Sequence, residues 1–281
     1  PPDLPVDHVF THIAQFDHAS LVRGLADKGF HLIELGGDLS IFLPHTFQQD
    51  AMDHLAALKA EKNLNFTVHL PLWSVEPSTP LTPVREGSVN AVIDTITATQ
   101  PLEPECYVLH ATGALAAEFN RMRISELAKS LLLRQFQASA QQSLEAILNQ
   151  TGINSRSLAI ETIEFPLELT LELANQLDLS ICFDTGHVLA GFSGETDFFT
   201  ALEMCLPRLG EVHLHDCPAF LKQGEIQYGN DHRSLGNGDL DTLRLLNRLE
   251  QAEFNGPIIF ELQLEQALES LEYIQSIQGS Y

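Results

Sequence analysis

The stretch Ile181-Cys182-Phe183-Asp184-Thr185-Gly186-His187 decides how the fold of this sequence is interpreted. Its first three residues are apolar and predict a short buried β-strand that ends in a carboxylate. The glycine is expected to let the chain turn sharply, so that Asp184 and His187 can face one divalent metal ion. Alone the motif is weak, because an aspartate that caps a turn gives the same pattern. Its weight comes from other predicted strands that end in the same way.

Outward from this stretch, short apolar runs alternate with longer helical patterns along the chain. The predicted strands cover residues 9–13, 31–35, 65–70, 106–110, 157–162, 180–184, 211–215 and 257–262. The predicted helices cover residues 19–28, 47–62, 83–100, 125–149, 166–176, 196–206, 242–252 and 265–277, with Ser125 and Asp239 as N-caps. Such alternation implies parallel strands joined by crossover helices.

This organisation predicts an α/β protein with a single domain over residues 1–281, folded as a closed (β/α)8 TIM barrel. The alternative is an open doubly wound sheet. That fold is disfavoured because the Gly-rich phosphate loop of a dinucleotide site does not follow the first predicted strand.

The charge of the chain argues against one class of partner. The sequence has 15 Lys and Arg against 38 Asp and Glu, a formal net charge of -23 at pH 7, and no basic cluster. Proteins that bind DNA or RNA use basic surfaces to displace counterions. We therefore expect a small-molecule substrate and no nucleic-acid polymer.

Composition also bears on location. No apolar run approaches the roughly 18 residues of a membrane span, and the Pro-rich start lacks a basic-then-apolar leader. The four cysteines, Cys106, Cys182, Cys205 and Cys217, show no spacing typical of a zinc ribbon or a disulfide framework. We expect buried, reduced thiols in a cytoplasmic protein that has no membrane partner.

Each predicted strand ends in a residue of metal-ligand type. In chain order these residues are His12, Glu34, His69, His110, Glu161, Asp184, His215 and Glu261. One buried His or Glu is most often a hydrogen-bonded core residue, but the strands of a parallel barrel all end at one rim. Without cations, acids gathered there would repel each other and would be costly to desolvate.

This gathering predicts divalent metal ions, with zinc as the first choice and manganese, iron or cobalt as alternatives. Two further ligands are expected from loops. His187 follows Asp184, and His232 lies in a turn-rich loop, residues 230–238, which we call the late loop. A solvated surface loop is the competing interpretation for His232.

On these residues the chain resembles the xylose isomerase-like TIM-barrel superfamily, from about Val9 to the last helix. This superfamily contains the endonuclease IV type of AP endonucleases and many sugar isomerases and epimerases. The resemblance to the epimerases implies one metal held by Glu161, Asp184, His215 and Glu261.

The resemblance to endonuclease IV implies additional ligands. His69 and His110 match its two extra strand-end histidines, and His187 and His232 match ligands of a third metal. The chain departs from the pattern in the late loop. Asn230 stands where an aspartate is expected and Asp231 stands beside it, which puts the third metal's aspartate in doubt.

The resemblance and the charge together favour a metal-dependent hydrolase of a phosphodiester or phosphoester in a small substrate. A cobamide is one candidate, as in the cobamide-remodelling phosphodiesterases of the superfamily. A two- or three-metal site would stabilise the attacking and the leaving oxygen. Glu161 would bridge two ions and Glu261 would orient the attacking water. Arg233 is expected to contact a phosphate oxygen, and Trp73 to pack against a substrate ring or to cap the barrel.

Two other classes of function remain open. The first is a sugar or sugar-phosphate isomerase or epimerase with one divalent metal, in which Glu161 and Glu261 exchange acid and base roles. The second is a binding or scaffold protein on an inactive barrel, which is disfavoured because the whole ligand set is present.

Overall fold

The computed structural model describes residues 16–278 of the chain. The predicted first strand, residues 9–13, and His12 at its end lie outside the described residues.

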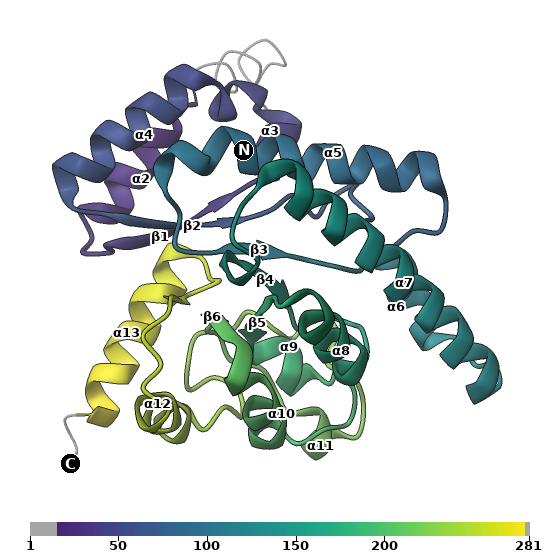
Figure 1. The fold of residues 1–281 in the computed structure, drawn as a ribbon. Helices are drawn as coiled ribbons and strands as arrows, with labels where there is room; N and C mark the ends of the chain where they lie inside the picture. The colour runs from purple at the N-terminus through teal and green to yellow at the C-terminus, as the bar shows by residue number, and fades with distance from the viewer. Residues whose placement is uncertain (1–15, 279–281) are drawn as a thin grey trace, which may run out of the picture.

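The centre of the fold is a parallel sheet whose seven strands follow one another in chain order (Figure 1). The strands are β1 (Leu32–Gly36), β2 (Asn65–His69), β3 (Tyr107–Leu109), β4 (Leu158–Glu161), β5 (Ser180–Asp184), β6 (Leu209–His213) and β7 (Ile258–Ile259). The sheet curves until β1 and β7 come into contact. The predicted TIM barrel is confirmed as a nearly closed parallel barrel, with seven of its strands in the described residues.

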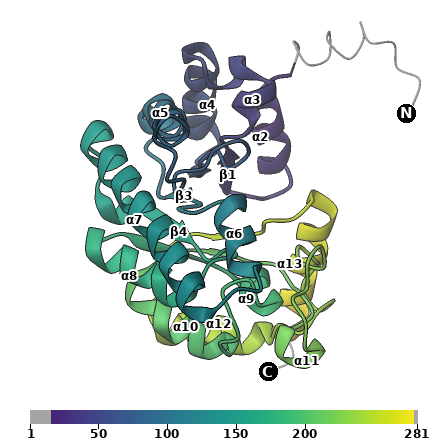
Figure 2. The same cartoon turned by 90° about the vertical axis from the view of Figure 1, so that its right-hand side faces the viewer.

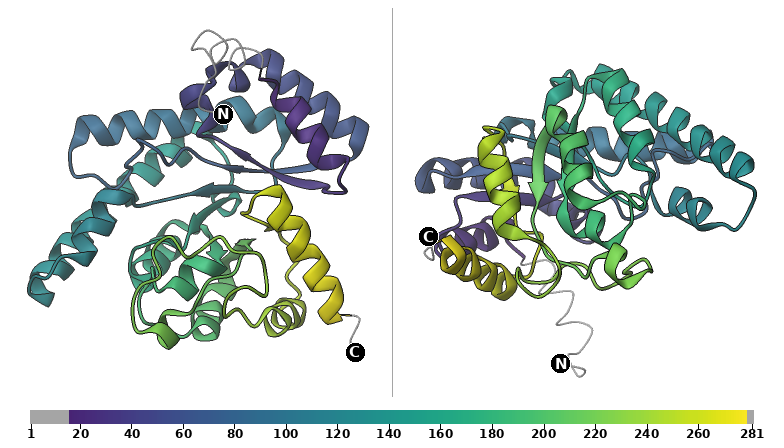
Figure 3. Two further views of the ribbon diagram at one scale, coloured as in Figure 1. Left: turned by 180° about the vertical axis from the view of Figure 1, so that it is seen from behind. Right: turned by 90° about the horizontal axis from the view of Figure 1, so that it is seen from below.

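Helices surround the sheet and connect its strands (Figure 2). They are α2 (His18–Ala26), α3 (Leu39–Phe42), α4 (Gln49–Lys62), α5 (Thr82–Thr99), α6 (Ala114–Arg121), α7 (Glu126–Thr151), α8 (Leu167–Leu177), α9 (Thr185–Ala190), α10 (Phe198–Cys205), α11 (Phe220–Gln223), α12 (Thr242–Gln251) and α13 (Leu264–Gln278). The long helix α7 reaches well beyond the sheet, with α6 beside it (Figure 3).

Capping residues explain where several helices begin. Ser125 caps α7 as predicted, because its hydroxyl accepts a hydrogen bond from the amide of Ala128. The predicted cap at Asp239 is wrong. Asp241 caps α12 through the amide of Arg244, whereas the Asp239 carboxylate binds the Lys222 ammonium and the Ala219 amide.

Alternation along the strands separates the main core from the barrel interior. On β5, Phe183 packs edge-on against Phe198 of α10, in the layer between sheet and helices. The neighbouring Cys182 belongs to a separate small cluster with Cys106, Val108 and Ala159. Because side chains alternate along a strand, Asp184 lies on the same side as Cys182 and faces the interior at the strand's end.

Two sequence expectations can be compared with this fold. All four cysteines are buried and free, as expected. Among residues 16–278, no helix has the length and apolar character required to span a membrane.

Candidate metal centre

Five strands end in residues that come together at one rim of the barrel. His69, Glu161, Asp184 and His213 are the last residues of β2, β4, β5 and β6, and Glu261 follows β7. In a parallel barrel the carboxyl ends of the strands share one face, where active sites are found. The predicted convergence of imidazoles and carboxylates therefore exists.

Glu161 lies at the middle of this group and is 1% exposed. Its Oε2 lies 3.1 Å from His69 Nε2 and 2.9 Å from His110 Nε2. Its Oε1 lies 3.1 Å from His187 Nδ1 and 3.7 Å from His213 Nδ1. The two oxygens of one carboxylate therefore face two different sets of imidazoles.

On the Oε1 side, four donors form a compact group. One ligand atom each from Glu161, Asp184, His213 and Glu261 lies within 4.8 Å of the others. His213 Nδ1 is 3.2 Å from Glu261 Oε2 and 3.7 Å from Asp184 Oδ2. Within the described residues, Glu161 Oε1, His213 Nδ1 and Glu261 Oε2 are buried without a hydrogen-bond partner. Buried polar atoms rarely stay unsatisfied, so this donor set fits a divalent cation. We call these four residues the inner group.

The inner group corrects one sequence expectation. The set was expected to contain His215, on a strand ending there, but β6 ends at His213 and His213 occupies that place. Residues two apart on a strand face the same way, so the sequence Glu211-Val-His213-Leu-His215 offers two equivalent candidates. His213 follows the apolar Val212 just as His215 follows the apolar Leu214, so the sequence carried no signal that separates them.

His215 lies next to the inner group but its ring is fully engaged. Its Nε2 is 2.8 Å from Asp184 Oδ2, and its Nδ1 accepts a hydrogen bond of 2.9 Å from the backbone amide of His232. These two bonds assign the neutral ring with hydrogen on Nε2. His215 is therefore a neighbour of the inner group with both ring nitrogens already bonded.

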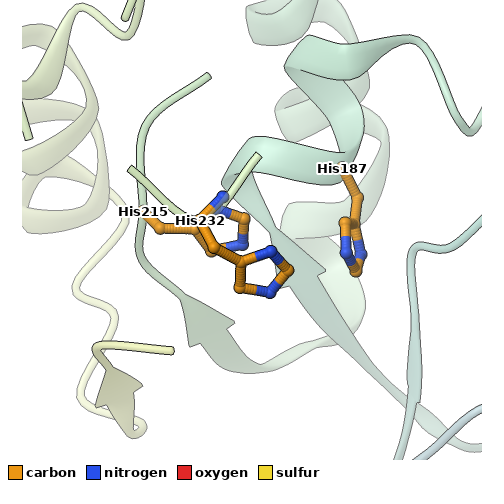
Figure 4. A group of neighbouring side chains, drawn as sticks. All are labelled: His187, His215 and His232. Carbon is orange, nitrogen blue, oxygen red and sulfur yellow. The ribbon is translucent and has the colours of Figure 1, made fainter. Parts of the chain in front are cut away.

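Three imidazoles form an outer group above the inner one: His187, His215 and His232 (Figure 4). The rings of His215 and His232 are stacked, with centroids 4.2 Å apart and planes 10° apart, and His187 in the first turn of α9 approaches them edge-on. His232 is the outermost, with its side chain 39% exposed. The two loop histidines predicted as ligands are thus side by side.

The uncertain aspartate of the late loop can now be assigned by position. Asp231 Oδ2 lies 3.1 Å from His232 Nδ1 and 3.7 Å from His187 Nε2. The side chain of Asn230 instead bonds Gln227 and Arg233. Asp231 is therefore the residue of this pair whose side chain lies beside the outer group.

Gly186 serves a different purpose from the one expected. It is a helical residue of α9 and does not form a sharp turn. A Cβ at this position would collide with Cε1 and Nδ1 of the His215 ring. Asp184 caps α9 by accepting from the amide of His187 at 2.6 Å, which fixes both side chains of the motif. The glycine therefore makes room for His215.

The late loop is anchored to the barrel by Asp216. Its carboxylate accepts hydrogen bonds from the backbone amides of Cys217, Gly236, Gly238 and Leu240. Its backbone pairs with that of Arg233, which lies next to His232. The sequence expectation overlooked Asp216, which holds the loop against the end of β6.

The two predicted substrate contacts lie in loops that follow strands of the barrel. Arg233 is held inside the late loop, where its Nη2 donates to Asn230 Oδ1 at 2.8 Å. Trp73 is 56% exposed in the turn after β2, and its ring packs edge-on against Phe42 at 6.1 Å. Both positions are on the loops that surround the rim.

Beneath the inner group, two more carboxylates line the barrel interior. His213 Nε2 lies 3.5 Å from Glu34 Oε1 and 3.6 Å from Glu211 Oε1. Burial and the charge of Glu34 raise the pKa of Glu211 to about 7. Glu34 was among the predicted strand-end residues, whereas Glu211 was missed. The sequence signal for Glu211 was its position two residues before His213, on the same side of the strand.

Residues 22–277 match the family described as xylose isomerase-like TIM barrel. The chain belongs to this family. The uncharacterized protein MJ1311 of Methanocaldococcus jannaschii is 23% identical over 226 residues, which are 77% of this chain and 71% of that protein. Two solved structures share the fold. A D-tagatose 3-epimerase-like protein has a TM-score of 0.70 and 21% identity over 90% of both chains, and endonuclease IV from Thermus thermophilus has 0.66 and 18% over 94% of both.

In this xylose isomerase-like barrel, the carboxylates and imidazoles of the rim shift each other's pKa values. Burial opposes ionisation of Glu161, but the positive charges of His110 and His213 hold its pKa well below the usual range. Burial also opposes protonation of His69, but the hydrogen bond to Glu161 and the charge of Glu34 raise its pKa to about 9. Without a divalent ion, a protonated His69 therefore faces Glu161, a carboxylate that a cation would otherwise neutralise.

Proposed function

We propose that this xylose isomerase-like barrel is a metal-dependent hydrolase that cleaves a phosphodiester or phosphoester in a small, non-polymeric substrate. The observation that supports this choice is the position of Glu161. Its Oε2 faces His69 and His110 while its Oε1 faces the inner group. A carboxylate between two donor sets suits two neighbouring ions, an arrangement found in phosphatases and nucleases.

The residues present fit such a centre. His69, His110 and Glu161 would hold one ion, and Glu161, Asp184, His213 and Glu261 a second. Divalent ions in these places supply Lewis-acid polarisation of a phosphoryl oxygen and lower the pKa of a water. Zinc suits the mixed imidazole and carboxylate donors, and manganese, iron and cobalt are the alternatives.

The chain's own residues would then orient the reactants. Glu261, a member of the inner group, is 32% exposed at its side chain and also lies beside His232, so it can accept a proton from a water that approaches the rim. Asp231 and His232 would face the leaving-group side. Arg233, in the same loop, supplies positive charge for a phosphate oxygen.

The acidity of the protein supports a small substrate. With a net charge of -23, long-range electrostatics repel a nucleic-acid polymer. A small phosphodiester such as the nucleotide loop of a cobamide can reach the rim without a basic cleft. Exposed Trp73 offers a ring on which such a substrate could pack.

A sugar or sugar-phosphate epimerase is the second candidate, and the inner group favours it. Three of its four members are carboxylates, and two of these, Glu161 and Glu261, could move a proton between the two faces of a carbon. The solved D-tagatose 3-epimerase-like structure shares the fold. In that reaction His69 and His110 would have no required part.

One experiment separates the two. Protein with zinc or manganese restored is assayed against small phosphodiesters, including a cobamide, and against ketoses in deuterated water. The double variant His69→Gln/His110→Gln is compared with Gln137→Ala, a buried change away from the rim. A hydrolase loses phosphodiester cleavage by ~10³-fold in the double variant. Deuterium incorporation into a ketose that survives in the double variant would overturn the proposal in favour of the epimerase.

A further inference from the structure

Among the described histidines of the rim, His215 differs in that a backbone amide donates to its ring. His69 also has both ring nitrogens bonded, but its partners are the oxygens of Leu70 and Glu161. The backbone amide of His232 donates to His215 Nδ1 at 2.9 Å, so Nδ1 must be the acceptor. The hydrogen is then on Nε2, which donates to Asp184 Oδ2 at 2.8 Å. To bind an ion, His215 would have to give up one of these bonds. His187 Nδ1 and both nitrogens of His213, by contrast, are buried and unbonded within the described residues.

The backbone that His215 holds is strained. His232 has φ 55°, in the left-handed region that is unfavourable for a residue with a side chain. Such a conformation persists only where the surroundings fix it. Here the bond to His215 Nδ1 and the stacking of the two rings supply that support.

The surroundings of His215 are built to hold its ring in one place. Thr185 accepts a hydrogen bond from the His215 amide at 3.0 Å and donates one to the His215 carbonyl at 2.6 Å. Gly186 leaves the space that the ring occupies. His215 is completely buried, so its orientation is set by packing and not by solvent.

We propose that His215 is a positioning residue and not a metal ligand: its imidazole ties the Asp184 carboxylate of the inner group to the backbone of the late loop at His232. Asp184 is thereby aimed at the inner group. The same bond keeps His232 and Asp231 beside His187. This inference rests on the proposed metal centre, because Asp184 matters here as a ligand.

Glutamine provides a sharp test because its amide oxygen and nitrogen flank one carbon, as the two ring nitrogens of His215 do. The variant His215→Gln keeps an acceptor for His232 and a donor for Asp184, whereas His215→Phe keeps the ring and loses both bonds. Each is compared with His213→Gln. Zinc content and zinc affinity are measured by elemental analysis and by competition with a chelator.

A positioning residue predicts that His215→Gln binds as many zinc ions as wild type, with affinity within ~3-fold, and that His215→Phe loses ~10–100-fold in affinity. His213→Gln should lose an ion. If His215→Gln lost an ion as His213→Gln does, the inference would be overturned while the metal centre stood. If wild-type protein bound no ion, the proposed function would fail.

Two measurements on folded protein keep the test decisive should His215→Phe not fold. Ring ¹⁵N shifts of wild type, followed during zinc addition, should move for His213 and stay fixed for His215. A shift of the His215 nitrogens as large as that of His213 would overturn the inference. In metal-free protein, the hydrogen-exchange rate of the His232 amide in His215→Gln should be within ~3-fold of wild type. An increase in that rate above ~10-fold would contradict the proposed hydrogen bond between residue 215 and the His232 amide.

Discussion

Two histidines at the carboxyl end of β6, His213 and His215, are equally buried, yet their ring nitrogens are bonded in opposite ways. Both are 0% exposed. His213 has carboxylates on either side and no hydrogen bond to either ring nitrogen, while both nitrogens of His215 are bonded. The unbonded ring is the one whose lone pair is available to a cation. Of these two histidines, the one suited to a cation is therefore the one whose ring nitrogens lack hydrogen-bond partners.

The largest expected effect comes from removing the carboxylate that both sides of the centre share. Glu161→Gln should lose two ions per chain and ~10³-fold or more in activity, because an amide is a poor ligand and Glu161 Oε1 and Oε2 face separate donor sets. Elemental analysis and the phosphodiester assay measure this. Glu168→Gln, an exposed residue of α8, is the matched control. If Glu161→Gln kept both ions, the proposal that Glu161 is shared by two ions would be wrong.

The difference between His213 and His215 is tested further by combining substitutions of the two residues. His213→Gln should reduce activity by ~10²-fold or more, while His215→Gln should cost less than ~10-fold. The activity of the double variant should be within ~3-fold of that of His213→Gln, because the orientation of Asp184 no longer matters once the ion of the inner group is lost. Steady-state kinetics at saturating zinc provide the measurement. Equal losses in the two single variants would remove the distinction between the two histidines.

A smaller effect is expected in the outer group. Asp231→Asn should weaken zinc binding by ~10-fold at one site only, because Asp231 is the carboxylate nearest to His187 and His232. The companion variant Asn230→Asp tests the position where the family pattern places the aspartate. Zinc titration in the presence of a chelator follows both. If Asn230→Ala weakened zinc binding more than Asp231→Asn did, the assignment of Asp231 in place of Asn230 would be wrong.

The smallest effect concerns pH. Burial opposes protonation of His69 and His187, but neighbouring carboxylates raise both pKa values to about 9, above the ordinary 6.5. In metal-free protein this stabilisation is complete below about pH 6.5 and is lost as pH rises through about 9, so Tm should fall over that range. Zinc replaces these protons, so the zinc-dependent gain in Tm should grow with pH. Thermal melts from about pH 6 to 9 test both signs, and a metal-free Tm that rose with pH would contradict them.

Much of the fold was predictable because hydrophobic alternation repeats along the chain. The bounds of the strand Ser180–Asp184 were predicted to the residue, and those of the other described strands to within a few residues. The identity of the inner histidine was not predictable, because His213 and His215 share a face and only the distant amide of His232 separates them. The role of Gly186 was equally hidden, since it depends on a ring that comes from another strand.

Glu34 and Glu211, placed in the barrel interior under His213, have a consequence for the order of events at the rim. A site with acids both at its surface and below its floor presents a negative potential to anything that approaches while it holds only protons. A phosphate-bearing molecule is repelled from that potential, whereas a cation is drawn to it. For the proposed metal centre, we therefore expect ions to bind first and an anionic substrate to bind only afterwards.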